Sequence, residues 1–464
     1  MALPTTGVWE IRTTGADDQG GGYNPARASP GPDYSQQDAA QVTFTDLVID
    51  GADSTKVTSA LNPFTSDHIA NYLQINSGTG YTAGVYEVTS VASNVATLDR
   101  SAGTTGSTGG AGKLGGAMAS PGKVAGVQAA SNIKHVKSGT YTFGSTANVS
   151  GGRISDEQVA ATDKPGRWIG YGTTREDGGT KPVFRSGASS ITLATQLAAS
   201  NYYENIQFER NTGSHTSVRG VLLDTNQGKV RHCKFVDLDN TGCRADGLSC
   251  TIEDSEATGC STGFAVNREN THLSRCTMTS CNIGLTTGGS ASGSITYSIA
   301  YGNTTDGFSL GTPGCHVEHC TAYNNGVSSG SGFNLSAGIA GFCVNCLSVG
   351  NFAFGFDTPG LSGRRLLNCA AFDNTSGDYN TSNFSTRDVI GFISLTADPF
   401  VNAAGGNFKL NSVPGGGRLV RGAGLPQTFA GLPLTTSRPD VGAVQHGDAD
   451  VPKLKFHPVS RRSF

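Results

Sequence analysis

The chain has 464 residues, of which 65 are Gly and only 15% are charged. Average proteins contain about 7% Gly and about 25% charged residues, so glycine is doubled and charge is scarce. The 33 basic and 36 acidic residues leave a net charge of −3, which excludes the strongly basic surface of a non-specific nucleic-acid binder. The glycines follow no three-residue period, which excludes a collagen-like chain.

The first residues, Met1 to Gly7, contain neither the basic nor the apolar segment of a secretory signal. No apolar run reaches the roughly 18 residues that a membrane helix needs. We therefore expect synthesis in the cytoplasm without an export signal, and no insertion into a membrane.

Residues 42–100 contain short runs of β-branched and aromatic residues, separated by Gly, Asn and Ser. Such runs favour strands joined by turns. The runs are Val42–Phe44, Leu47–Ile49, Tyr72–Ile75, Val85–Val88 and Val95–Leu98. They predict a small antiparallel β-barrel or sandwich. The Gly, Ser and Thr of the following segment predict a linker over residues 101–121.

A repeat occupies the stretch that follows residue 200. Each copy carries an apolar residue and, three positions later, an anchor residue that is usually Cys or Ser. Successive anchors are 27, 22, 21, 22, 22, 26 and 23 positions apart. The anchors are Ile206, Cys233, Ser255, Cys276, Ser298, Cys320, Cys346 and Cys369. Repetition at such a period is typical of a solenoid.

Two further columns keep the same register. Five positions after the anchors stand Cys260, Cys281, Asn303, Asn325, Asn351 and Asn374. A Gly followed by an apolar residue recurs at Gly263-Phe264, Gly284-Leu285, Gly307-Phe308, Gly332-Phe333 and Gly355-Phe356. We expect Cys and Ser to pack where the interior is narrow, and Phe or Leu to fill its wide side. The Asn residues should pass amide hydrogen bonds from copy to copy.

Each copy is predicted to form strands and not a helix. Its β-branched residues alternate with small ones, and its apolar residues do not follow the 3.6-residue period of a helix. The dense Leu pattern of leucine-rich repeats is missing as well. Three short strands per copy, stacked at about 4.8 Å, make a parallel β-helix. The sequence therefore predicts an all-β fold class.

Several segments resemble right-handed parallel β-helix repeat proteins of bacteria and their viruses. Trp9–Arg12 resembles their opening strand, Lys137–Tyr141 and Trp168–Gly172 their early coils, and residues 398–444 their closing coil. The resemblance covers roughly residues 115–445 and implies a right-handed, single-stranded parallel β-helix. It also suggests that the small β domain is inserted between the opening strand and the first full coil.

The expected division of the chain follows from these patterns. It comprises an N-terminal arm with the opening strand (1–41), the β domain (42–100), the linker (101–121), the β-helix with its closing coil (122–445) and a basic tail (446–464). The tail carries Lys453, Lys455, Arg461 and Arg462. It is either solvated or a docking strap.

The 11 cysteines all lie in the repeat, and two groups look like metal or redox motifs, Cys315–Cys320 and Cys343–Cys346. However, Cys320 and Cys346 stand in the anchor column, where other copies carry Ser. A metal ligand would not be replaced by Ser in this way. We therefore interpret the cysteines as small packing residues, predict reduced thiols, and assign no metal or cofactor site.

Two pairs of carboxylates could serve a glycosidase, Asp237 with Asp239 and Glu253 with Asp254. On consecutive copies they fall into rows of alternating charge. One row holds Glu204, Arg231 and Glu253, and the next holds His232, Asp254 and Arg275. Ion pairs on a solvated sheet face imitate catalytic clusters, so we assign no catalytic residue.

The resemblance says little about activity, because the fold serves lyases, hydrolases, adhesins and virion parts. A small N-terminal β domain joined to a β-helix resembles phage fibres, spikes and capsid-associated proteins. We expect a structural protein of a bacteriophage virion that assembles with other capsid or tail proteins. By the same resemblance we expect a homo-oligomer, in the form of a trimer, that could contact host surface glycans.

The alternative is a polysaccharide depolymerase of the tailspike type, either a glycoside hydrolase or a lyase. Sugar-binding faces use exposed aromatic rings, and both Trp residues of this chain precede the repeat. The lack of Trp in the repeat, where a glycan would bind, favours the structural role over the depolymerase. A bacterial surface protein exported by another route is the third hypothesis.

Overall fold

The computed structural model describes residues 3–4, 6–127, 132–143, 154–155, 166–187, 189–196, 200–211, 215–312, 314–335, 341–358, 365–385, 387–425 and 439–445. The basic tail therefore lies outside the described residues. The chain forms two units, Met1–Thr251 and Ile252–Phe464.

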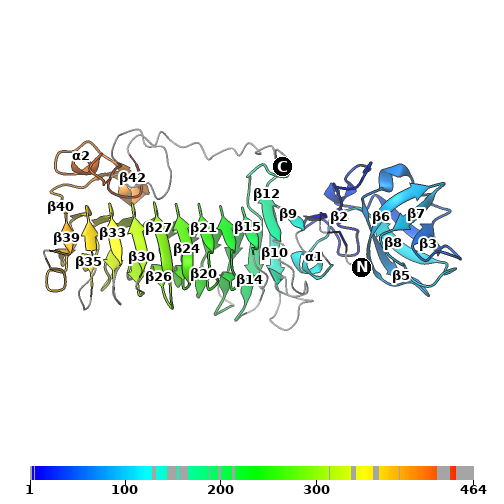
Figure 1. Ribbon diagram of the computed structural model, residues 1–464, viewed down its shortest axis with the longest axis horizontal. Coiled ribbons are helices and arrows are strands. Elements are labelled where there is room, and N and C mark those ends of the chain that lie inside the picture. The colour runs from blue at the N-terminus through cyan, green and yellow to red at the C-terminus, as the bar shows by residue number, and fades with distance from the viewer. Residues whose placement is uncertain are drawn as a thin grey trace. The chain divides into compact units, whose positions relative to one another are not determined.

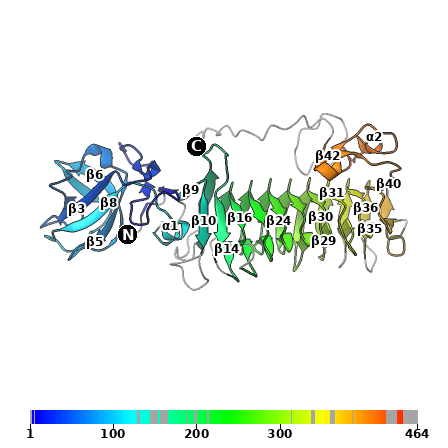
Figure 2. The same ribbon diagram turned by 180° about the vertical axis from the view of Figure 1, so that it is seen from behind.

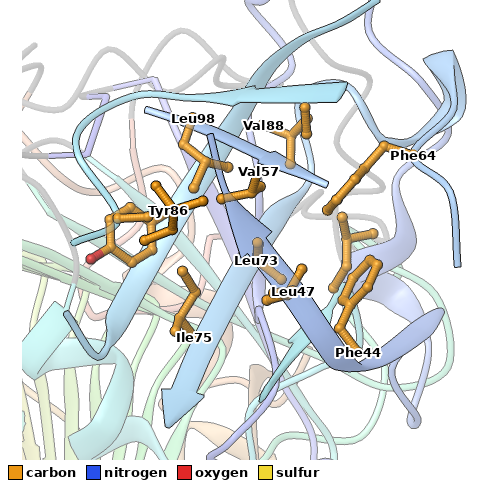
Figure 3. Packing of buried hydrophobic residues seen from close by; sticks show 13 residues of the cluster. Phe44, Leu47, Val57, Phe64, Leu73, Ile75, Tyr86, Val88 and Leu98 are labelled. Carbon is orange, nitrogen blue, oxygen red and sulfur yellow. The ribbon is translucent and has the colours of Figure 1, made fainter. Parts of the chain in front are cut away.

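Unit 1 contains a closed antiparallel barrel with the strand order β3-β4-β7-β6-β5-β8 (Figure 1). The strands are β3 (Val42–Ile49), β4 (Lys56–Thr58), β5 (Tyr72–Ser77), β6 (Gly84–Ala92), β7 (Val95–Leu98) and β8 (Gly110–Leu114). A short 3-10 helix, η2 (Ser66–His68), precedes β5. Figure 3 shows the apolar interior, in which the Phe44 and Phe64 rings stack at 4.8 Å. The predicted β domain is thus present as a barrel.

The prediction of a linker over residues 101–121 is wrong in part. Strand β8, which lies within this segment, closes the barrel against β3 and β5. A Cβ atom at Gly112 would lie 2.7 Å from the Gln74 carbonyl oxygen and 3.3 Å from Leu47. Glycine is required there by close packing. Composition alone made this tightly packed strand look flexible.

The opening strand β1 (Val8–Ile11) pairs with the short β2 (Gly22–Tyr23) and in parallel with β9 (Ile133–Lys137). The barrel therefore interrupts the chain between two neighbouring strands, as predicted. Buried ion pairs hold this arm: Glu10, with no exposed surface, lies 2.9 Å from Arg12 and 2.8 Å from Arg175. Arg175 also pairs at 2.9 Å with Asp33, beside η1 (Tyr34–Gln36).

The remaining strands of unit 1 stack in parallel as three sheets (Figure 1). The first sheet holds β9, β12 (Arg167–Tyr171), β15 (Tyr202–Glu204) and β18 (Lys229–Arg231). The second holds β10 (Thr140–Phe143), β13 (Val183–Ser186), β16 (Gln207–Glu209) and β19 (Lys234–Val236). The third holds β11 (Ile154–Ser155), β14 (Thr192–Gln196), β17 (Arg219–Leu223) and β20 (Thr241–Ala245). The helix α1 (Pro121–Val127) precedes this stack in the chain.

Unit 2 has the same three-sheet architecture (Figure 2). Its first sheet contains β24 (Glu269–Ser274), β27 (Ser292–Thr296), β30 (Cys315–Glu318), β33 (Phe342–Val344), β36 (Arg365–Leu367) and β39 (Val389–Ile390). The second contains β22 (Glu256–Thr258), β25 (Thr277–Thr279), β28 (Ile299–Tyr301), β31 (Thr321–Tyr323), β34 (Leu347–Val349), β37 (Ala370–Phe372) and β40 (Ile393–Ser394). The third contains β23 (Thr262–Val266), β26 (Ile283–Thr287), β29 (Phe308–Leu310), β32 (Phe333–Asn334), β35 (Phe354–Asp357) and β38 (Gly377–Tyr379). The strand β21 (Thr251–Glu253) stands where one unit ends and the other begins.

The anchor residues are buried in both units, at 1% exposure or less. The residue before each anchor adopts a left-handed backbone with φ between 49° and 56°. This conformation turns the chain from the first sheet into the second. In unit 2 these residues form what we call the corner column: Asp254, Arg275, Tyr297, His319, Asn345 and Asn368. Asn and Asp tolerate the left-handed region better than most residues do.

The predicted asparagine ladder is present in unit 2. Asn303 donates from Nδ2 to Oδ1 of Asn325 at 2.8 Å, Asn325 donates to Asn351 at 2.9 Å, and Asn351 donates to Asn374 at 2.8 Å. Each Oδ1 also accepts the main-chain N–H of the preceding rung, as Asn351 does from Asn325 at 3.0 Å. The amides are therefore satisfied inside the stack, as buried polar groups must be.

The predicted closing coil forms a different structure. The strands β41 (Phe400–Asn402) and β42 (Asn407–Leu410) pair antiparallel with each other, with η3 (Ala403–Gly405) between them and α2 (Gly417–Val420) after them. Phe400 and Phe408 pack against Tyr301 and Tyr323 of the second sheet. An outward sheet face that carries aromatic rings needs a cover, because exposed apolar surface is unfavourable in water. The hairpin supplies that cover.

Candidate functional site

Alternate residues of the first-sheet strands point away from the interior, and in unit 2 they align into two rows. The first row contains His272, Ser294, His316, Phe342 and Arg365. The second row, next to the corner column, contains Ser274, Thr296, Glu318, Val344 and Leu367. We call the two rows together the outward face of unit 2.

The first row combines rings with polar groups. The His316 ring stacks on Phe342 with centroids 4.6 Å apart and planes 20° apart. Nδ1 of His272 lies 2.7 Å from the Ser294 hydroxyl. The row continues to the exposed Arg365 guanidinium. Such a row offers flat surfaces for stacking and hydrogen-bonding groups at the spacing of the strands, about 4.8 Å.

The second row carries the one carboxyl of this face that is strongly perturbed among the described residues. Glu318 is only 6% exposed, and burial raises the pKa of its carboxyl from 4.5 to about 7. Both its protonated and its ionised form are therefore populated near neutral pH. A carboxyl in that state can both donate and accept a proton, which general acid–base catalysis requires. His316 lies two residues away on the same strand and face.

The residues of the motif Cys315–Cys320 are dispersed by the fold. Cys315 packs with Val266 and Ala291, whereas His316 and Glu318 belong to the outward face. His319 stands in the corner column. The described residues contain no group of three or more His, Cys, Asp or Glu side chains arranged to hold a metal ion.

All 11 cysteines are buried free thiols. Most of these thiols donate to main-chain carbonyls, as Cys320 does to the Ile295 oxygen at 3.5 Å. Burial raises the pKa of Cys276 to about 12, so this thiol is neutral and unreactive at physiological pH. These observations agree with the packing role that the anchor column predicts.

The candidate carboxylate pairs are parts of ion pairs and turns. Asp254 forms a two-bond pair with Arg275, at 2.6 and 3.0 Å. Asp239 accepts two main-chain N–H groups and lies 3.6 Å from Arg210. Asp237 occupies a corner with φ at 51°, and Glu253 lies on β21 beside Asp254. The interpretation as structural charge rows therefore fits these residues.

Sequence reasoning missed Glu318, which stands in the same strand position as Glu204 and Glu253. The available signal was its flanking rungs. Glu204 faces Arg231 across the ladder, whereas Glu318 faces Thr296 and Val344. A carboxyl without an opposite charge in the neighbouring rungs is the position where a raised pKa is expected.

Residues 219–383 match the family model described as right handed beta helix region, a little more than a third of the chain. No curated protein matches. The solved structures that resemble this one include pectate lyase Pel9A, which is 16% identical with a TM-score of 0.47 and covers 71% of this chain and 91% of its own. The AlgE4 A-module, a mannuronan C-5 epimerase of Azotobacter vinelandii, is 12% identical with a TM-score of 0.35 and covers 56% and 87%.

ORF18 of Geobacillus virus E2 is 14% identical with a TM-score of 0.29, covering 57% of this chain and 54% of its own. At such identities structural neighbours speak for the fold alone. The family match and the strand register together identify an all-β protein that contains a right-handed parallel β-helix and a six-stranded N-terminal barrel.

Proposed function

We propose that this chain is a structural protein of a bacteriophage particle, and that the outward face of unit 2 contacts an extended polysaccharide. The observation that carries the glycan contact is the first outward row, where the stacked His316 and Phe342 rings are flanked by Ser294 and Arg365. The particle role is supported by the combination of a small β domain with a β-helix, which resembles phage fibre and spike proteins.

The row suits a polymer because its groups recur at the strand spacing, about 4.8 Å. Sugar rings present apolar C–H faces that stack on aromatic side chains, and their hydroxyls bond to polar neighbours. The asparagine ladder that follows the second-sheet strands holds the whole stack rigid, since Asn325, Asn351 and Asn374 are linked by side-chain hydrogen bonds. A rigid face loses little entropy when it binds.

A second candidate function is polysaccharide depolymerisation, which Glu318 favours. Its pKa of about 7 suits a general base or acid at neutral pH. In this reaction Glu318 would exchange a proton with the sugar, and His316 on the same face would bind or orient it. Hydrolysis by paired carboxyls would require a second acid at a defined separation, so elimination by a single base fits this face better.

Binding to immobilised bacterial polysaccharides, both neutral and acidic, tests the glycan contact. We expect Phe342→Ala to weaken binding about tenfold, equivalent to roughly 1.4 kcal/mol, and His316→Ala to act in the same direction. The matched control is Phe352→Ala, because Phe352 is 42% exposed and does not belong to either outward row. Equal losses in the two Phe variants, or no binding to any polysaccharide, would count against the glycan contact.

Two further measurements separate the candidates. Release of reducing ends or of unsaturated sugars that disappears in Glu318→Gln would establish the depolymerase. Mass spectrometry of purified virus particles tests the structural role directly, since a virion protein must remain with the particle through gradient purification. Light scattering tests the proposed trimer, because a monomer has a mass of 47.7 kDa.

A further inference from the structure

The C-terminal part of unit 2 contains two short stretches, residues 422–425 and 439–445, that lie against the corner column. We call them together the strap. Asn345 bonds to both main-chain groups of Leu425: its Oδ1 accepts the N–H at 2.8 Å and its Nδ2 donates to the carbonyl at 3.0 Å. Asn368 donates to the Ala423 carbonyl at 2.8 Å. The N–H of Gly442 donates to the Asn345 carbonyl at 2.8 Å.

His319 joins the same network with both ring nitrogens. Its Nδ1 lies 3.1 Å from the carbonyl oxygen of Asp440 in the strap, and its Nε2 lies 3.2 Å from Nδ2 of Asn345. A carbonyl oxygen can only accept and an amide nitrogen can only donate. Nδ1 therefore carries the proton and Nε2 accepts, a pattern that only the neutral imidazole satisfies.

The Asn345 amide cannot turn over to accommodate a charged His319. Turning it would place its NH₂ group against the N–H of Leu425 and its oxygen against the Leu425 carbonyl. The Oδ1 atom also accepts a hydrogen bond from Asn368 at 3.1 Å. Protonation of Nε2 would consequently set two donors against each other inside a buried site, which costs about the free energy of one or more lost hydrogen bonds.

The groups around His319 have opposing effects on its charge. The Asp440 carbonyl and carboxylate of the strap favour the charged imidazolium, as does the Tyr297 ring, stacked at 4.9 Å, whereas the Cys346 thiol of the adjoining coil is uncharged. Glu318 and Cys320 are its neighbours on its own chain segment. Burial is the largest influence, since only 2% of His319 is exposed, and it lowers the pKa of this residue. His319 is therefore neutral at physiological pH.

We propose that the strap is an acid-released cover, which stays on the corner column while His319 is neutral and detaches when its Nε2 is protonated. The second outward row runs beside this column, and its members Thr296, Glu318 and Val344 are all 6% exposed or less although they point outward. Strap release would expose the corner column beside this row, together with Thr321, whose hydroxyl accepts the Ala443 N–H at 2.9 Å. Its meaning for glycan contact rests on the proposed function, whereas the release itself does not.

Hydrogen–deuterium exchange of the full chain, followed by mass spectrometry, tests the release. After correction for intrinsic rates, peptides that contain Leu425 or Gly442 should exchange about tenfold faster at about pH 5 than at about pH 7.5. Peptides of the asparagine ladder should remain protected at both values and report that the stack is folded. In His319→Gln, which cannot be charged, the strap should stay protected at both values.

The matched control is His316→Gln, because His316 lies on the same strand but does not contact the strap through any bond of the described residues. This variant should keep the acid response. Asn345→Ala should expose the strap at both pH values, which keeps the test open if His319→Gln fails to fold. Unchanged wild-type exchange, an acid response that survives in His319→Gln, or its loss in His316→Gln would overturn the proposal. Polysaccharide binding at pH 7.5 is measured separately, so failure of the glycan contact would not be mistaken for failure of the strap.

Discussion

Unit 2 contains two rows of polar side chains in which amide groups form hydrogen bonds between rungs. The two rows differ in their bonding partners. The inner row, Asn303 to Asn374, bonds amide to amide inside the stack. The outer row, His319, Asn345 and Asn368, also passes bonds from rung to rung but turns part of its capacity toward the strap. The printed partners of the inner row all belong to the stack itself, whereas the outer row is also bonded to a separate segment, the strap. The difference suggests that the first stabilises the fold and the second allows a segment to detach.

The sharpest way to break this comparison is to remove one amide from each row. Asn351→Leu interrupts bonds to Asn325, to Asn374 and to Ser348. Unpaired buried groups cost about 1–3 kcal/mol each, so this variant should lose several kcal/mol in urea denaturation. Asn368→Leu should lose less, because its partners can reach water when the strap moves. Equal losses in the two variants would remove the distinction.

The next effect is the pH dependence of Glu318, beside the outer row. Its carboxyl pKa is raised in the folded protein, from 4.5 to about 7, so the folded state holds the proton more tightly than the unfolded chain does. This contribution to stability is complete below about pH 4.5 and is lost as the pH rises through about 7. In Glu318→Gln the loss disappears, and the variant should gain up to about 3 kcal/mol over the wild type between pH 5 and pH 8. Urea denaturation at both values measures it, and a difference that does not vary with pH would contradict the buried state of Glu318.

Cys276→Ser should change stability by less than about 1 kcal/mol. The flanking anchors Ser255 and Ser298 already donate to carbonyls two residues before them, at 2.7 and 2.9 Å. Cys276 makes the corresponding contact to Ser274 at 3.4 Å, so a hydroxyl would find the same acceptor. Thermal or urea denaturation should place this variant far closer to the wild type than Asn351→Leu. Titration of the unfolded, unreduced chain should find all 11 thiols, and a markedly lower number would reveal disulfides.

The smallest effect on stability is expected at Arg275, a member of the corner column that pairs with Asp254. Arg275→Gln removes the ion pair with Asp254, whose side chains are 37% and 20% exposed. Such pairs contribute about 0–1 kcal/mol and weaken with salt. Denaturation at low and high salt should show the loss only at low salt. A loss as large as that of Asn351→Leu would mean that the corner column itself supports the stack.

The period of the repeat made the interior predictable, because residues that occupy equivalent places in stacked coils must satisfy the same packing. That is why Cys320, Asn325 and Phe333 are buried where their columns require. The left-handed backbone of the corner column was harder to predict. Arg275 and Tyr297 adopt it because of their position in the coil, although neither residue type favours it.

Structural features that do not recur with the repeat could not be predicted from the sequence. The strap depends on pairs such as Asn345 and Leu425, 80 positions apart, and no local pattern announces such a contact. β8 was hidden because Gly112 serves close packing and not flexibility. Glu318 resembled its neighbours in the charge rows until its burial was known.

The first and last strands of the barrel, β3 and β8, are neighbours. Val42 of β3 pairs with Leu114 of β8, so the two ends of the barrel lie side by side. Paired residues of antiparallel strands lie about 5 Å apart, a gap that a short turn can span. A different domain with adjacent ends could therefore replace the barrel while β1 still pairs with β9, provided that it also packs against Trp9 of β1, whose ring centroid lies 5.1 Å from that of Tyr72. In this way the N-terminal domain could be exchanged without altering the β-helix.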